Sequence, residues 1–371
     1  MLIPALGTIL KTAPYGLSNA SYGTLFLPET LGALIGAVLA GRIAQRFGLV
    51  GLLRFGLLAN IAALAFLITG ALAGGSVVTF ALFLLETACL GAGFGLTLAA
   101  VNDAATLLFP AGASAAVTVL NAVIGGGTAI SPLILAAVTA HTAWWAWPVA
   151  LLLVFVGAAA LSGSLSEVPG TAARTASAAR MPARLWWYAG IVVIYAICEG
   201  TFGSWASIFV HTDRGGTAAQ GAFALSAFWG AMTLARIGFG SATKWLPPKR
   251  IYAYSPLAIA LVFVTVPLMH GAGALILLFA LAGVACSYFF PFSMAFAIEE
   301  NPAQRAAASG LLVAALMAGE GIGSYALGPL QSAHVLTLGA IYRTSALWGV
   351  LLFPAAWWIL RTKQHNAVAP A

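Results

Sequence analysis

Four glutamates lie inside long apolar segments, where an ionised side chain is costly. They are Glu29, Glu86, Glu199 and Glu320, each near the middle of its segment. A charge at that depth in a bilayer costs on the order of 2.5–3.5 kcal/mol on insertion scales. No Lys or Arg occurs at the same depth in these segments, which favours protonated carboxyl groups. The chemistry open to them is binding of a proton, a cation or a hydroxylated solute, or a structural bond to a neighbouring backbone.

Small residues share a helical face with each of these carboxylates. Glu29, for example, aligns at helical spacing with Gly32 and Gly36. Small residues mark close contacts between membrane helices. We therefore expect the four carboxylates to face protein or a central cavity rather than lipid.

Other polar or aromatic side chains lie at similar depth. Asn102 and Asn121 could supply amide groups, and Trp205 and Trp229 could supply aromatic faces, a combination that suits sugar binding. The alternative for each Trp is packing, or anchoring at the membrane interface.

The segments that carry these residues are those of a membrane protein. The chain has 371 residues, of which 61% are hydrophobic and only 7% charged, with a mean hydropathy of +0.99. A soluble protein would carry about 25% charged residues. Runs long enough to span a bilayer are predicted at 20–41, 49–73, 77–100, 114–140, 144–164, 185–210, 219–241, 251–272, 274–298, 306–331 and 340–360. The predicted fold class is an all-α polytopic membrane protein with about 11 complete spans.

One long polar stretch divides the chain. Residues 163–184 are rich in Gly, Ser, Pro, Ala and Arg, which is typical of a flexible linker. We expect an N-terminal bundle at 1–162 with five complete spans and a C-terminal bundle at 185–371 with six. Of the sixteen basic residues, all but Lys11, Arg214 and Arg343 fall on one side of this topology, which the positive-inside rule makes cytoplasmic. The C-terminus is then cytoplasmic, and the protein is a multi-pass protein of the cell membrane.

Several functional classes find no support in the sequence. No nucleophile–base pair, phosphate-binding loop or metal-ligand spacing occurs, and the three cysteines lie in apolar segments. The net charge of +7 is accounted for by the cytoplasmic loops rather than by nucleic-acid binding. We therefore predict no enzyme, no cofactor and no metal site.

The segment GRIAQRFG (41–48) resembles a motif of the major facilitator superfamily, which lies between the second and third spans of that family. The matching residues are Gly41, Ala44, Arg46, Phe47 and Gly48, with Gln45 in place of the family's acidic residue. Arg236 and Gly240 match the second copy of the motif, 194 residues after Arg42. The resemblance implies two pseudo-symmetric helical bundles, and a chain that begins inside the family's first span. It also implies that a cytoplasmic gate loop (Gly41, Arg42, Arg46, Gly48 and Arg236) latches the inward side or binds acidic lipid.

Within that superfamily, two segments are similar to the fucose permease-like group. The matching residues are Tyr195, Glu199, Trp205, Ser226, Phe228, Trp229 and Arg236, and Asn102 and Asn121 also fit. The group's fourth-span glutamate would fall near Leu98, and its first-span aspartate has no counterpart.

The resemblance implies a secondary active transporter, working by alternating access as a monomer. We expect a small polar solute such as a sugar, with protons as the coupling ion and Glu29, Glu86, Glu199 and Glu320 among the binding residues. Proton-driven efflux of amphipathic cations and a non-transporting membrane sensor stay open as alternatives.

Overall fold

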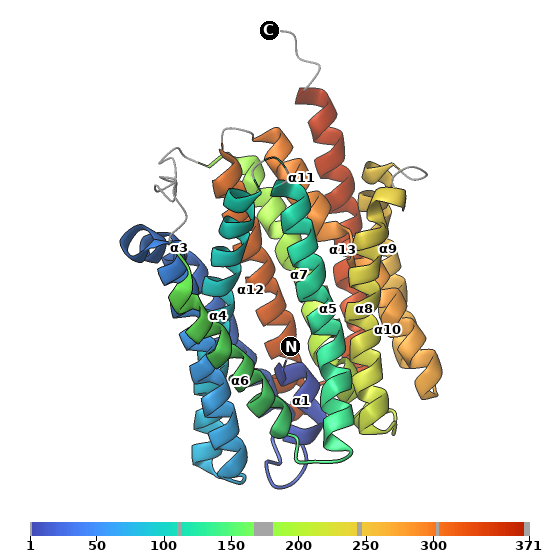
Figure 1. Cartoon of the computed structure of the whole chain (residues 1–371). Coiled ribbons are helices and arrows are strands. Elements are labelled where there is room, and N and C mark those ends of the chain that lie inside the picture. The colour runs from blue at the N-terminus through green and yellow to red at the C-terminus, as the bar shows by residue number, and fades with distance from the viewer. Residues whose placement is uncertain are drawn as a thin grey trace. The chain divides into compact units, whose positions relative to one another are not determined.

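The structure, a computed structural model, describes residues 2–109, 111, 113–166, 181–242, 247–301 and 304–366. Within these ranges every regular element is a helix (Figure 1), which confirms the predicted all-α fold class. The first half contains α1 (Leu2–Leu10), α2 (Asn19–Thr24), α3 (Phe26–Leu72), α4 (Val77–Leu108), α5 (Ala113–Thr139) and α6 (Ala146–Leu161). The second half contains α7 (Ala183–Ile208), α8 (Ala218–Ala242), α9 (Pro248–Thr265), α10 (Ala272–Cys286), α11 (Phe289–Glu300), α12 (Arg305–Ser332) and α13 (Leu338–Asn366).

The helices form two compact units. The N-terminal unit comprises Ile9–Gly127 and Leu133–Thr175, and the C-terminal unit comprises Met1–Thr8, Thr128–Pro132 and Ala176–Ala371. Most of the predicted linker at 163–184 lies outside the described residues, because 167–180 are not described. The bundle boundaries at 1–162 and 185–371 stay a prediction.

Local sequence explains where several helices begin. Ser76 and Thr79 form a capping box in which each side chain binds the other's backbone N–H, and α4 begins there. Pro248 occupies the first turn of α9, where its missing N–H costs nothing. Gly271, with a φ of 97°, turns the chain into α10.

Helix α3 is a hairpin of two helices in the N-terminal unit. Its first part runs parallel to α4, since Gly32 meets Ala88 and Gly36 meets Ala92. Its second part runs antiparallel to α4, since Asn60 meets Gly93 whereas the later Gly70 meets Phe83. The chain therefore reverses direction between these parts. Gly48 has non-helical dihedrals (φ 77°, ψ 177°) in a region that only glycine adopts without strain, and it makes this reversal.

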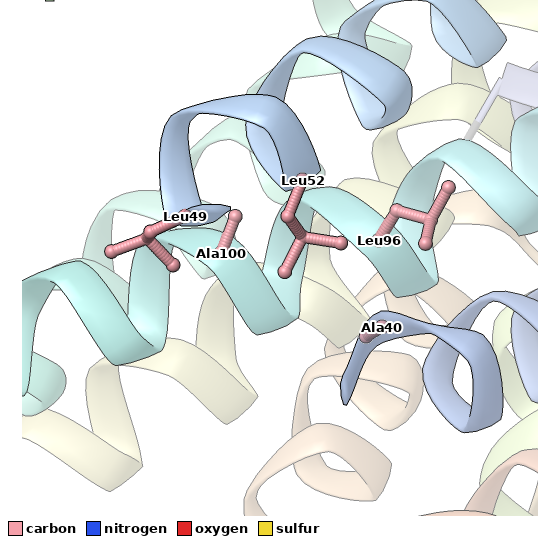
Figure 2. Close-up of a cluster of buried hydrophobic side chains, with 5 residues drawn as sticks. All are labelled: Ala40, Leu49, Leu52, Leu96 and Ala100. Atoms are coloured by element: carbon pink, nitrogen blue, oxygen red, sulfur yellow. The ribbon is translucent and has the colours of Figure 1, made fainter. Parts of the chain in front are cut away.

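A small apolar cluster joins the two parts of the hairpin near the reversal. Ala40 comes from the first part, Leu49 and Leu52 from the second, and Leu96 and Ala100 from α4 (Figure 2). All five are buried, and each is no more than 9% exposed. The cluster fixes both parts of α3 against one face of α4.

Eight helical stretches in the described part of the chain are long and apolar enough to span a membrane. One of them, Asn19–Leu72, has 54 residues and would be about 80 Å long as a straight helix, far more than a bilayer core of about 30 Å. It covers the predicted span 20–41 and residues 49–72 of the predicted span 49–73. Helices α8 and α13 cover the predicted spans 219–241 and 340–360 but are not among the eight. The count of eleven spans stays a prediction.

Three helix pairs build the C-terminal unit: α7 with α12, α8 with α10, and α9 with α13 (Figure 1). Glycines allow close approach of α7 and α12, because a Cβ at Gly200 would lie 2.5 Å from the carbonyl oxygen of Glu320. Aromatic rings fill the interior, with Phe202 stacked on Phe263 at a centroid distance of 4.0 Å. Several buried polar side chains of α7 and α8, including Glu199 and Ser226, lie within this packed unit.

Candidate functional site

Glu199 has a basic partner, which corrects the expectation that the membrane-embedded carboxylates have none. The Nη2 atom of Arg236 on α8 lies 3.6 Å from Oε1 of Glu199 on α7. The Glu199 side chain is 3% exposed and the Arg236 side chain 41%. Arg236 was also expected in a loop, but α8 stays helical past it. Because side chains on a helix tilt toward its N-terminus, the long guanidinium arm of Arg236 reaches back to the depth of Glu199.

A break between α10 and α11 supplies the rest of the environment of this ion pair. Helix α10 ends at Cys286, about one turn before Pro291. Because proline has no backbone N–H, the carbonyl four residues before it lacks its helical hydrogen-bond donor. For Pro291 this is the carbonyl of Ser287. Arg236 Nε donates to that carbonyl at 3.1 Å, and the Tyr195 hydroxyl donates to the carbonyl of Cys286 at 2.6 Å. The ion pair and the helix break therefore hold each other in place.

Three buried polar atoms along α7 and α8 have no hydrogen-bond partner among the described residues. They are Oε2 of Glu199, Oγ of Ser226 and Nε1 of Trp229. The Trp229 ring packs against Gly203, where a Cβ would lie 2.7 Å from a ring carbon. Glu199 lies one turn before Gly203 on α7, and Ser226 lies one turn before Trp229 on α8. Buried polar atoms in proteins are almost always paired, so this set suits a ligand that both donates and accepts hydrogen bonds.

Trp205 and Glu320 lie on the α7–α12 contact. The Trp205 Nε1 atom donates to the carbonyl oxygen of Ser324 at 2.9 Å, and the ring is fully buried. The backbone of Glu320 packs against Gly200. The geometry of Trp205 supports the packing alternative that the sequence left open for it.

Glu29 and Glu86 lie together in the N-terminal unit. Glu86 on α4 is fully buried, and neither carboxylate oxygen has a hydrogen-bond partner within the described ranges. Glu29 on α3 is half-buried and interacts electrostatically with Glu86. The burial of Glu86 and Glu199 confirms the expectation that these carboxylates face protein.

The two asparagines bind their own helices. Asn102 donates to the carbonyl of Leu98 and Asn121 to the carbonyl of Val117, each at 2.8 Å. Asn102 is half-buried on α4, and Asn121 is exposed on α5. Their amide oxygens are the groups that a solute could use, and their place in a binding site stays a prediction.

The expected gate loop is helical. Gly41, Arg42 and Arg46 lie in the first part of α3, and only Gly48 leaves the helical conformation. Arg42 and Arg46 are exposed, and the Arg46 guanidinium lies 5.3 Å from the centroid of the Phe47 ring. The placement in a loop was therefore wrong, because the hydrogen-bonded turns continue up to a single reversing glycine. The proposed gating role of these residues is untested.

Two residues of this site match the fucose permease-like group but were not predicted to be site residues. Tyr195 precedes Glu199 by one turn, and Ser226 precedes Trp229 by three residues, so helical periodicity places each on the face of a chosen residue. The carbonyls of Cys286 and Ser287 were missed, although the position of Pro291 could have indicated them.

Comparison with solved structures identifies the fold. A D-xylose–proton symporter matches with a TM-score of 0.76 at 16% identity, covering 96% of this chain and 91% of that one. The nucleoside transporter NupG matches with a TM-score of 0.71 at 15% identity, covering 96% and 94%. FucP, a transporter of the major facilitator superfamily captured in the outward conformation, matches with a TM-score of 0.63 at 16% identity, covering 96% of both chains.

The chain is thus an integral membrane protein with the fold of the major facilitator superfamily, as its sequence motifs predicted. The solved structures that share this fold are transporters. No protein-family model and no curated protein matches the sequence.

Proposed function

We propose that the protein is a secondary active transporter that moves a small hydroxylated solute, such as a sugar or nucleoside, by alternating access. Two of the structures with the same fold are a xylose–proton symporter and a nucleoside transporter. The observation that carries the proposal is the set of three buried polar atoms on α7 and α8 that find no hydrogen-bond partner in the described part of the chain. A solute hydroxyl could donate to Glu199 Oε2 and accept from Trp229 Nε1, and a second hydroxyl could bind Ser226.

The charges around this set favour a neutral solute. Arg236 compensates the charge of Glu199, so the site carries no uncompensated negative charge to attract a cation. The Trp229 ring offers an aromatic face of the kind on which a sugar or a base can stack. Both features favour the hydroxylated solute over the amphipathic cation.

The remaining assignments follow from the sequence. We place the protein in the cell membrane as a monomer with a cytoplasmic C-terminus, and we take protons as the coupling ion. Asn102, Asn121 and Glu320 are proposed to contribute to solute binding. Arg42 and Arg46 are exposed, as contact with acidic lipid or an inward gate requires.

Purified protein in proteoliposomes tests the proposal. We expect radiolabelled xylose or uridine to accumulate when an inward proton gradient is imposed, and Trp229→Phe to reduce this uptake by removing the indole N–H. Trp348→Phe is the matched control, since Trp348 lies on α13 and is 37% exposed. Ethidium movement without any sugar or nucleoside uptake would favour the efflux alternative, and specific solute binding without transport would favour a sensor.

A further inference from the structure

We propose that Glu86 and Glu29 form a proton-binding pair in the N-terminal unit, and that this pair carries the coupling proton. The inference rests on the proposed transport function for its role, but the site itself is argued from geometry. In this proposal, Glu29 on α3 and Glu86 on α4 bind the proton, and Glu199 on α7 binds the solute.

The parallel packing of α3 on α4 brings the two carboxylates to the same depth. The backbone of Glu29 lies against Gly91. Gly32 of α3 meets Ala88 of α4, and Glu29 and Glu86 lie three and two residues before these two positions. Because α3 and α4 are parallel here, the two glutamates lie at nearly the same level. The electrostatic interaction of the two carboxylates agrees with this placement.

A buried apolar residue lies on the other side of Glu86. In the antiparallel part of α3, Asn60 meets Gly93 and Gly70 meets Phe83. The same register sets Leu67 opposite Glu86, and Leu67 is fully buried. Glu86 therefore lies between the two parts of the hairpin, with Glu29 on one side and an apolar wall on the other.

Few other titratable groups reach the pair. Tyr22 on α2 interacts with Glu29, and Cys89, one turn along α4, interacts with Glu86. Between Phe55 and Leu72 of α3, and throughout α5 and α6, the sequence contains no titratable residue.

No arginine or lysine of the described residues forms an ion pair with Glu29 or Glu86, in contrast to Glu199 with Arg236. Two negative charges in this apolar setting would repel each other, whereas one or two bound protons remove this repulsion. Because the two carboxyl groups interact, they take up and release protons as a pair. At Glu199, Arg236 already offsets part of the carboxylate charge, so a bound proton relieves less repulsion there than at the pair.

Two measurements on purified protein test the pair. The variants are Glu86→Gln and Glu29→Gln, with Asp103→Asn as the control, because Asp103 is an exposed carboxylate on the same helix. A monodisperse size-exclusion profile identifies the variants that fold.

The first measurement is infrared spectroscopy of the carboxyl groups. We expect a protonated-acid C=O stretch from the buried pair that Glu86→Gln removes and Asp103→Asn leaves in place. If the band is unchanged in both Glu86→Gln and Glu29→Gln, the pair does not hold a proton and the proposal fails. This result does not depend on any transport activity.

The second measurement compares two transport modes in proteoliposomes. Solute counterflow needs no net proton movement, whereas accumulation under a proton gradient does. We expect Glu86→Gln to keep counterflow but to lose proton-driven accumulation, down to the level of protein-free liposomes. Full accumulation by Glu86→Gln would overturn the coupling role, as would accumulation that follows a sodium gradient instead. If the unmodified protein shows neither mode, the proposed function fails while the infrared result still decides the site.

Discussion

The reversal of α3 at Gly48 gives a prediction whose size can be worked from the backbone. Gly48 has a φ of 77° and a ψ of 177°, a combination that residues with a Cβ adopt at a cost of about 1–3 kcal/mol. Each kcal/mol lowers the melting temperature of a unit of this size by about 2–4 °C. Gly48→Ala should therefore lower the melting temperature of the N-terminal unit by about 2–12 °C.

Gly41→Ala is the matched control within the same segment. Gly41 is helical, and a Cβ built on it meets nothing within 4 Å. Alanine in that position gains up to about 1 kcal/mol of helix propensity over glycine. Gly41→Ala should leave the melting temperature unchanged or slightly raised.

Thermal unfolding in detergent, followed by circular dichroism, measures both variants against the unmodified protein. The N-terminal unit should respond first, because the cluster of Ala40, Leu49 and Leu52 on α4 depends on the reversal (Figure 2). Equal melting temperatures for Gly48→Ala and Gly41→Ala would refute the reasoning, since the backbone at Gly48 would then tolerate a side chain.

Three further predictions concern packing, charge and pH. A Cβ at Gly95 would lie 2.6 Å from a backbone carbonyl oxygen of α3, so Gly95→Ala should lower the stability of the protein by about 1–3 kcal/mol. Gly126→Ala should not lower it, because a Cβ there meets nothing within 4 Å. A lower melting temperature for Gly126→Ala than for Gly95→Ala would contradict the α3–α4 packing. Arg236→Gln should destabilise the unmodified protein more than it destabilises the Glu199→Gln variant, because only the unmodified protein is left with the buried Glu199 carboxylate unpaired. A double-mutant cycle that shows no coupling between the two positions would disprove the ion pair. Burial lowers the pKa of the Lys11 ammonium in the folded protein below its unfolded value near 10.5. Between these two pKa values the unfolded chain binds more protons than the folded one, so the stability of the protein rises with pH in this range. Lys11→Met should therefore have a higher melting temperature than the unmodified protein at pH 7, and this difference should shrink toward pH 10.5.

Much of the fold could be predicted because hydropathy and small-residue spacing act locally. The apolar runs predicted the helices, and Gly32 and Gly36 predicted the close contact that α3 makes with α4. The helical turn through Arg42 could not be predicted in the same way. The charges and glycines of residues 41–48 are typical of a loop, yet backbone hydrogen bonding continues to Gly48.

The site was harder to predict, because it depends on distances between helices. In the sequence, Arg236 lies near the end of its apolar segment, whereas Glu199 lies near the middle of its own. The two side chains meet only because the long Arg236 side chain extends from α8 to α7. Likewise, no spacing within α4 shows that Glu86 has no hydrogen-bond partner among the residues that the structure describes, because its neighbours come from the two parts of α3. The break before Pro291 was predictable only in part. The proline indicates that a backbone carbonyl is left without its helical partner, but not that Arg236 binds this carbonyl.

The turn at Gly48 also bears on which compartment each loop of the chain meets. Every passage through a bilayer exchanges inside for outside, so the side of any later loop depends on whether the number of passages before it is odd or even. Asn19–Leu72, taken as one rod, contributes a single passage, whereas the hairpin described above contributes two. One glycine thereby inverts the side assigned to everything downstream of it, including the C-terminus.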